Sequence, residues 1–401
     1  MKHSVLPIFL KCIAIISCQT SPTSNVRASD NDFESFSIAS KDGQVSLEGQ
    51  INFPKGFKGE TFPLVVMVPG TGLFDRDVEF GRSSTDKDLV FKVLGNAILS
   101  RGIATLRYDY RGVSCNSRTV APCTECQSSS ERRSHFISKC IDNEIRKNVT
   151  PENIRDDIES VYLNAKNHSK VDPNRIVVFG HSEGSVNLSY LIKQKRISPK
   201  GAIFMGGLAE SLANIIEWQM TDRMINGIMA MDKNEDYIVT NDEISMSHAE
   251  SYLKAFPLES LLSPDGQWSR EQLEVFYNER YEQTKNDALA KDDSEPFGSG
   301  EIVQASYRWW KMFFIDKQAI VDNFSEFRGP VIFHNGDSDI QTDFARQKRK
   351  IEEARKDHGI NISLVPHIGL GHSLGKDPIM GPISDDSRSR LVDSIETILE
   401  R

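Results

Sequence analysis

Hydrophobic residues recur at every second position in some segments of the chain and at helical spacing in others. The first pattern predicts strands and the second predicts helices. Residues 33–54 alternate apolar and polar side chains around a Lys-Asp-Gly turn, which is typical of a β-hairpin. Residues 62–68 then form a continuous apolar run that ends in "PGTG". Such a run favours a strand that is buried on both faces, as in a parallel sheet.

Helical spacing follows that strand. Apolar residues on one stripe of residues 89–98 predict a helix, and residues 103–110 predict the next strand. Thr150 is placed as an N-cap and Pro151 at the first helical position of another amphipathic helix. That helix leads into "RIVVFGHSEG", a helix from Ser185 and a further strand. Strands that recur between helices predict an α/β fold with a doubly wound, mostly parallel sheet.

The alternation of predicted strands and helices is interrupted for about 120 residues and then resumes. The interruption is helical, acidic and aromatic, and we interpret it as an inserted cap. The predicted units are a leader (1–28), a first part of the core (29–207), the cap (208–325) and a second part of the core (326–401). The first part of the core contains a cysteine-rich excursion at residues 113–149, and the chain ends in an amphipathic helix.

The first twenty residues resemble an export signal. They have a basic start and an apolar stretch too short to span a bilayer, although Lys11 interrupts it. "IISC", ending at Cys18, resembles a lipobox, whereas "VRA", ending at Ala28, fits cleavage after small residues. We expect an exported protein that is periplasmic, secreted or anchored to a membrane through a lipidated Cys18. The alternative is a cytosolic protein with a disordered N-terminus.

The other cysteines gather in the polar excursion of the core. Four of the six cysteines lie there: Cys115, Cys123, Cys126 and Cys140. An even count in such a segment predicts two disulfides, for which three connectivities exist. A zinc site and free thiols are the alternatives, but the unequal spacing does not match a familiar zinc ribbon.

The charge balance excludes one class of partner. The chain has 48 basic and 57 acidic residues and a net charge of −9. No Lys/Arg-rich block with interleaved aromatic residues is visible, so we expect no nucleic acid partner.

Ser182 is the candidate nucleophile. It lies between Gly180 and Gly184, after an apolar strand and before a helix. A strand that turns sharply into a helix exposes the serine hydroxyl on strained backbone, and the turn needs small neighbours. The alternative is a serine that serves only the turn.

A serine hydroxyl needs a base, and the base needs a carboxylate to orient it. His372 follows a late strand on a glycine-lined loop and is the predicted base, while we expect His181 and His367 to be structural. Asp339, three residues after a strand-ending glycine, is the predicted acid. Asp339 and Asp337 could instead both be solvated turn residues.

The predicted oxyanion hole consists of two backbone amides. The amide of Glu183 follows the nucleophile, and the amide of Thr71 follows the early buried strand. The glycines around Thr71 would also explain a simple turn.

Taken together, these motifs resemble those of the α/β-hydrolases, over most of residues 45–207 and 326–399. The matching stretches are "VVMVPGTGLFDRD", "LRYDYRGVS", "GHSEG", "GDSDIQ" and "GLGHS". They are most similar to the esterase, lipase and peptidase-like branches that resemble dienelactone hydrolases. Two positions depart from the pattern: Pro69 replaces the usual histidine of the oxyanion loop, and Ser114-Cys115 stands where glycine is common.

The resemblance implies a fold and a reaction. It implies an α/β-hydrolase core, a Ser182, Asp339, His372 triad, and an oxyanion hole from the amides of Thr71 and Glu183. We expect a serine hydrolase that cleaves small carboxylic esters through an acyl-enzyme, with no cofactor for catalysis. The alternatives are a serine peptidase or aminoacyl hydrolase, a thioester hydrolase, and a non-catalytic calcium-binding scaffold.

Residues 232–243 of the cap resemble an EF-hand loop. The candidate calcium ligands are Asp232, Asn234, Asp236, the carbonyl of Ile238, Thr240 and Glu243. Tyr237 departs from the pattern, since glycine is normal at loop position 6. A second loop around Asp265 and Gly266 lacks the first ligands. A structural calcium ion is therefore expected in the cap, and the alternative is a solvated acidic helix–turn–helix.

Overall fold

The computed structural model describes residues 32–56, 60–80, 85–115, 123, 125, 126, 129–299 and 302–401. The predicted leader and the candidate lipidation site at Cys18 lie outside these residues. In the part of the chain that is described, no helix is both long enough and apolar enough to span a membrane.

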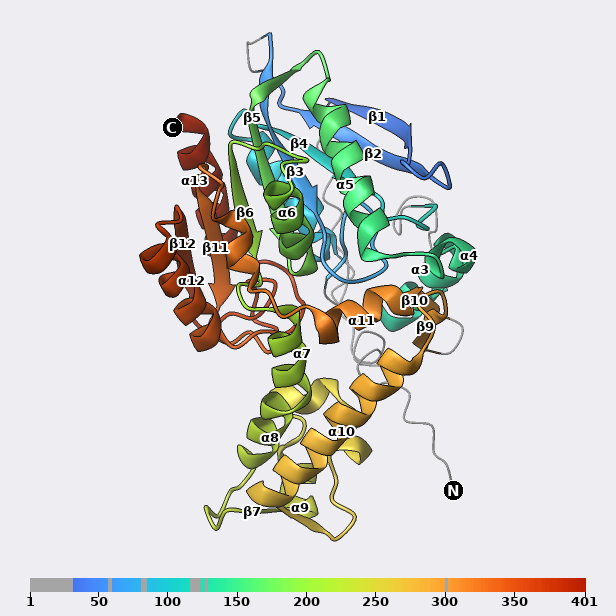
Figure 1. Ribbon diagram of the computed structural model, residues 1–401, viewed down its shortest axis with the longest axis vertical. Helices are drawn as coiled ribbons and strands as arrows, with labels where there is room; N and C mark the ends of the chain where they lie inside the picture. Colours follow the sequence, from blue (N-terminus) through green and yellow to red (C-terminus); the bar gives the residue numbers. More distant parts are fainter. Residues whose placement is uncertain are drawn as a thin grey trace.

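A central sheet of eight strands organises the core (Figure 1). Its order is β1-β2-β4-β3-β5-β6-β11-β12, antiparallel at β1-β2 and β2-β4 and parallel from β4 onward. The strands are β1 (Asp32–Ala39), β2 (Ser46–Phe53), β3 (Phe62–Val68), β4 (Ala104–Tyr108), β5 (Val171–His181), β6 (Gly201–Met205), β11 (Val331–Gly336) and β12 (Ile362–His367). The predicted hairpin and doubly wound, mostly parallel sheet are thus confirmed.

Helices cover both faces of this sheet because its strands are apolar on both sides. In β3, Leu64 and Val66 pack into one hydrophobic cluster, and Val65 and Met67 pack into another on the opposite face. The helices of the core are α2 (Val90–Leu99), α5 (Pro151–Lys166), α6 (Glu183–Lys193), α12 (Phe344–His358) and α13 (Asp385–Glu400). Helices α2 and α13 pack on one side and α5, α6 and α12 on the other.

Local sequence signals set several helix boundaries. The Thr150 side chain accepts a hydrogen bond from the amide of Asn153, and the Asn153 side chain accepts one from the amide of Thr150. This capping box and Pro151 start α5 where the sequence predicts it. Helix α6 begins at Glu183 rather than at Ser185, because the chain turns into the helix directly after Ser182.

The cysteine-rich excursion packs on the core. It contains α3 (Ser129–Cys140) and α4 (Asn143–Arg146). Disulfides join Cys115 to Cys140 and Cys123 to Cys126, one of the three connectivities considered. Phe136 and Cys140 are buried in the main hydrophobic cluster, so this segment has more apolar contact than its polar sequence predicts.

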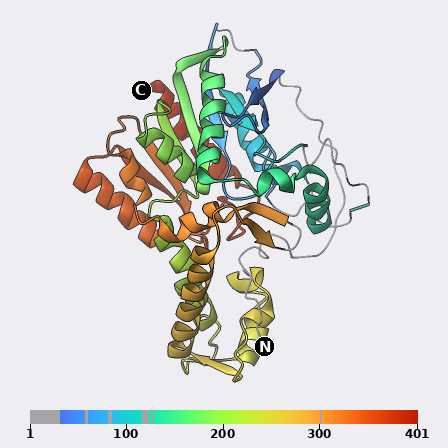
Figure 2. The ribbon, with the colours of Figure 1, turned by 45° about the vertical axis from the view of Figure 1, so that its right-hand side comes forward.

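In the segment between β6 and β11, predicted as the cap, residues 212–290 project from one end of the sheet, whereas residues 296–324 lie against the core (Figures 1 and 2). The elements of the whole segment are α7 (Leu212–Met220), α8 (Asp222–Met229), β7 (Ile238–Thr240), α9 (Asn241–Ser247), η2 (Tyr252–Ala255), η3 (Leu258–Ser260), β8 (Gln267–Ser269), α10 (Arg270–Ala290), β9 (Pro296–Ser299), β10 (Ile302–Ser306), α11 (Tyr307–Ile315) and η4 (Ile320–Phe324). A short 3-10 helix, η1 (Asp86–Asp88), precedes α2 in the core. One hydrophobic cluster lies wholly within the segment between β6 and β11, and a second, which contains Trp309, Trp310 and Phe314, also includes Val149 and Val186 of the core.

Candidate functional site

Ser182 lies on a sharp turn between β5 and α6. Its backbone has φ 52° and ψ −123°, a strained conformation for a residue with a side chain. A Cβ on Gly184 would lie 2.5 Å from the carbonyl oxygen of Val68, and one on Gly180 would lie 2.9 Å from the Gly184 backbone. The two glycines flanking Ser182 are therefore required by close backbone packing, as the motif predicts.

Asp339 and His372, which are 33 residues apart in the chain, meet at the carboxyl ends of β11 and β12. His372 Nδ1 and Asp339 Oδ2 are 2.7 Å apart, and both residues are buried. Asp339 Oδ2 also accepts a hydrogen bond from the Thr342 hydroxyl, and Oδ1 accepts one from the amide of Gln341. Asp337, the other acid considered, is exposed and accepts from the amide of Gly369.

The end of β6 brings His372 and Ser182 to the same place. The amide of Ser182 donates to the carbonyl of Met205, and the next residue, Gly206, contacts His372. A Cβ on Gly206 would lie 2.8 Å from His372 Nδ1, so only glycine leaves room for the imidazole. The structure thus positions the predicted base and the predicted nucleophile around one strand end.

The two histidines set aside as structural are buried. His181 packs its ring 4.9 Å from that of Phe80 and 5.0 Å from that of His372. Burial, and then the nearby His372, hold the pKa of His181 well below its ordinary value, so His181 stays neutral. His367 lies at the end of β12, hydrogen-bonded to His334 and Ser387.

The loop that follows β3 passes directly over the turn at Ser182. A Cβ on Gly70 would lie 2.7 Å from the Cβ of Ser182, so Gly70 allows this approach. Thr71 follows on the same loop, and Glu183 opens α6, where the first amides have no partner within the helix. The two amides predicted for an oxyanion hole therefore flank the Ser182 turn.

Ion pairs between two of the sequence motifs hold this loop. The backbone amide and guanidinium of Arg76 donate to the carboxylate of Asp109, with Nη2 to Oδ2 at 2.5 Å. Arg107 Nη1 also forms an ion pair with Asp77 Oδ1, and the Tyr110 hydroxyl donates to the carbonyl of Pro69 at 2.6 Å. The "FDRD" and "LRYDYRG" stretches thus bind each other.

The side chain of Glu183 connects three parts of the molecule. Thr71 Oγ1 donates to Glu183 Oε2 at 2.5 Å, and Trp309 Nε1 donates to Glu183 Oε1 at 2.9 Å. Glu183 is buried, so these bonds are shielded from water. The sequence predicts a role for the amide of Glu183 but not for its side chain. The side-chain partners, Thr71 and Trp309, are more than one hundred residues away along the chain.

Comparisons with known proteins point to a fold. No family model matches the chain, and no curated protein matches it. Among solved structures, a lipase in its open form matches with a TM-score of 0.51 at 16% identity, over 92% of this chain and all of the lipase. The α/β hydrolase GrgF from Penicillium sp. sh18 matches with a TM-score of 0.48 at 15% identity, over 92% of this chain and 100% of GrgF. Est1E from Butyrivibrio proteoclasticus bound to ferulic acid matches with a TM-score of 0.47 at 14% identity, over 91% of this chain and 98% of Est1E.

The chain has the α/β-hydrolase fold. Ser182, Asp339 and His372, the predicted nucleophile, acid and base, follow β5, β11 and β12 in that order along the chain. At such low sequence identities the comparisons establish the fold alone.

The EF-hand-like loop of the cap keeps some features of its pattern. Val239 in β7 lies opposite Trp268 in β8, and Tyr237 has φ 67° at the position where glycine is normal. The carboxylate of Asp232 accepts hydrogen bonds from the amides of Glu235 and Tyr237. Within the described ranges, no three His, Cys, Asp or Glu side chains converge on a metal site. Both the EF-hand and its calcium ion therefore stay predictions.

Proposed function

We propose that this protein is an exported serine hydrolase that cleaves small carboxylic esters. The observation that carries the proposal is the buried hydrogen bond between Asp339 and His372 beside the strained turn of Ser182. In serine hydrolases a histidine takes the proton of a serine on a strained turn. A buried carboxylate orients that histidine and stabilises its protonated form.

In the proposed reaction, His372 acts first as base and then as acid. His372 Nε2 accepts the proton of Ser182 Oγ, which attacks the ester carbonyl carbon and forms a tetrahedral intermediate. The alcohol leaves with the proton held by His372, and an acyl-enzyme remains. Water, activated by the same imidazole, then releases the acid and restores Ser182. Asp339 keeps Nδ1 protonated and stabilises the imidazolium in both steps.

The amides of Thr71 and Glu183 stabilise the negative oxygen of the intermediate. Their positions are fixed before reaction, since the Thr71 hydroxyl bonds the Glu183 carboxylate and Tyr110 holds the carbonyl of Pro69. Donors that need no rearrangement contribute strongly to acyl transfer.

A panel of substrates tests the proposed reaction and its alternatives. Purified protein is assayed with p-nitrophenyl esters of increasing acyl length, thioesters of the same acyl groups, and aminoacyl p-nitroanilides. We expect turnover of short esters above that of thioesters and anilides. Faster hydrolysis of anilides would indicate a peptidase, and faster hydrolysis of thioesters a thioesterase. No turnover of any of them would leave the non-catalytic calcium-binding scaffold as the better account.

Export is part of the proposal. The apolar leader and the disulfides Cys115–Cys140 and Cys123–Cys126 support it, because disulfides persist in oxidising compartments. Mass spectrometry of the N-terminus from cell fractions separates cleavage near Ala28, a lipidated Cys18 and an uncleaved cytosolic chain.

We also propose a structural calcium ion in the cap loop, held by the six EF-hand ligands named above. Calcium that binds only the folded state stabilises it by about 2.7 kcal/mol at 100 times its dissociation constant. For a chain of this size, that stabilisation raises the melting temperature by about 3 °C. Thermal unfolding in calcium and in chelator measures the difference.

The matched control for calcium is a pair of variants. Glu243→Gln, which weakens the bidentate ligand position, should abolish the calcium-dependent rise, whereas Asp265→Asn in the second loop should keep it. Equal melting temperatures of the wild-type protein in calcium and chelator would refute a structural ion.

A further inference from the structure

A cavity opens beside the oxyanion loop, between the core and α11. Its volume is about 440 Å³ when its opening to solvent is included. Thr71 and Glu183 line it on the side of the Ser182 turn, and Gln304 and Trp309 line it from the cap. The cavity therefore begins where an ester carbonyl would be bound and extends away from it.

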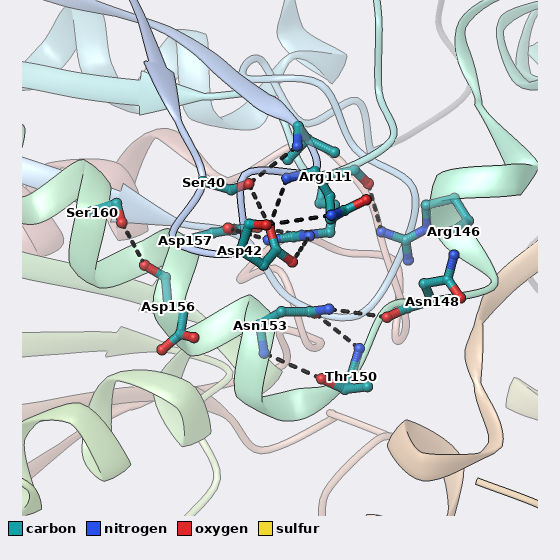
Figure 3. A network of polar contacts seen from close by, with 12 residues as sticks. Ser40, Asp42, Arg111, Arg146, Asn148, Thr150, Asn153, Asp156, Asp157 and Ser160 are labelled. Atoms are coloured by element: carbon teal, nitrogen blue, oxygen red, sulfur yellow. Dashed lines mark hydrogen bonds and ion pairs between the residues drawn. The ribbon is translucent and has the colours of Figure 1, made fainter. Parts of the chain in front are cut away.

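Arg146 is a buried cation that lines this cavity, and Figure 3 shows it beside Arg111. Its Nη1 donates to the carbonyl of Arg111 at 2.9 Å and its Nη2 donates to the carbonyl of Gln304, but Nε has no partner. In the described part of the chain, no carboxylate forms an ion pair with Arg146 at contact distance. The Tyr108 hydroxyl, which lines the same cavity and is 2% exposed, also has no partner.

Arg111 lines the same cavity, and its guanidinium, unlike that of Arg146, is paired with carboxylates. Its Nε and Nη2 donate to the two oxygens of Asp157, and its Nη1 donates to Asp42 (Figure 3). Burial alone would lower the pKa of Arg111, but these bonds raise it above its ordinary value. Burial instead lowers the pKa of Arg146 to about 10, because more distant acids such as Glu183 compensate only in part.

The other charges of the cavity are already engaged. Asp157 is held by Arg111, and Glu183 accepts hydrogen bonds from Thr71 and Trp309. Buried charges are costly unless they are paired, and arginine binds carboxylates through parallel N–H donors. Glu183 has only neutral hydrogen-bond donors and acts on Arg146 from a distance, so Arg146 is the one cation of the described cavity lining without a carboxylate at contact distance.

We propose that this cavity is a subsite for a carboxylate carried by the ester substrate, with Arg146 as its recognition residue and the Tyr108 hydroxyl as a second donor. The subsite rests on the proposed hydrolase function and specifies its substrate class: half-esters of small dicarboxylic acids, or esters whose alcohol carries a carboxylate. Arg146 determines specificity and takes no part in the chemical steps.

Matched esters test the subsite on the intact enzyme. The acyl-side probes are p-nitrophenyl pentanoate, its hemiglutarate analogue, and the neutral monoamide of that analogue. The alcohol-side probes are 4-butyryloxybenzoate and its methyl ester. We expect kcat/KM to be about 10- to 100-fold higher for the carboxylate member of one series, as for one charge-assisted contact. A wild-type enzyme that prefers the carboxylate in neither series, or whose acyl-side preference extends equally to the neutral monoamide, would overturn the inference.

Variants then locate the effect. Arg146→Gln should lower the ratio of kcat/KM for the carboxylate ester to that for its neutral partner by about 10- to 100-fold, and Arg146→Lys should keep part of the preference. Arg308→Gln removes a cation from the exposed Arg308–Glu152 pair, which joins α11 to α5, and should keep all of the preference. Equal losses on charged and neutral esters in Arg146→Gln would mean a structural role only and would contradict the proposal.

Failure of the subsite differs from failure of the proposed function. If pentanoate is hydrolysed without any preference for the carboxylate, the subsite is wrong and the hydrolase stands. If no ester is hydrolysed at all, the proposed function itself is wrong. The wild-type comparison settles the subsite even where Arg146→Gln does not fold.

Discussion

Replacing Ser182 with alanine is expected to lower kcat for ester hydrolysis by about 10⁶-fold, because the acyl-enzyme can no longer form. The residual rate would come from the oxyanion amides and substrate binding alone. The fold should persist, since the Ser182 side chain makes no capping hydrogen bond to α6. Steady-state kinetics and the melting temperature measure the two effects separately.

The matched control for Ser182→Ala lies on α6, the helix that follows Ser182. Ser189 is buried, donates to the carbonyl of Val186 and accepts from Asn323. Ser189→Ala should cost about 1–3 kcal/mol of stability for its lost hydrogen bonds and leave kcat within a few-fold. Equal activity of Ser182→Ala and the wild-type enzyme would exclude Ser182 as nucleophile.

Replacing Asp339 with asparagine is expected to lower kcat by about 10⁴-fold. An amide at this position cannot stabilise the imidazolium, and its NH₂ group favours the tautomer of His372 that has its proton on Nε2. The oxygen of asparagine can still accept from the Gln341 amide, so the loop should keep its shape. Kinetics with a neutral ester across a pH series would measure the loss.

Asp337 provides the matched control for this substitution. It lies two residues earlier and is exposed, and its carboxylate accepts from the amide of Gly369 and the hydroxyl of Ser338. Asp337→Asn should therefore keep kcat within about threefold. If Asp337→Asn lost the larger share of activity, the acid would have been assigned to the wrong residue.

Local patterns in the sequence were sufficient to predict most of the core. The apolar run of residues 62–68 predicts a buried strand because burial on both faces leaves no polar position, and β3 is such a strand. The capping box of Thr150 is equally local, since both partners lie within one helical turn. The glycines at 180 and 184 predict the turn at Ser182 because backbone clashes leave no room for side chains.

Contacts between distant segments were not predictable from such patterns. The Arg76–Asp109 pair joins residues 33 positions apart, and Trp309 reaches Glu183 across 126 positions, from the cap to the core. The burial of Phe136 against the core likewise depends on where the excursion packs. Arg146 gave no signal at all in the sequence, because an arginine on a short polar helix usually lies in solvent.

The most direct test of the account is covalent labelling of the wild-type protein with a fluorophosphonate, which reacts with serines activated for acyl transfer. The account predicts one adduct per chain, located by peptide mass spectrometry on Ser182, absent from Ser182→Ala and strongly slowed in Asp339→Asn. A folded wild-type protein that stays unlabelled, or an adduct on another serine, would contradict it.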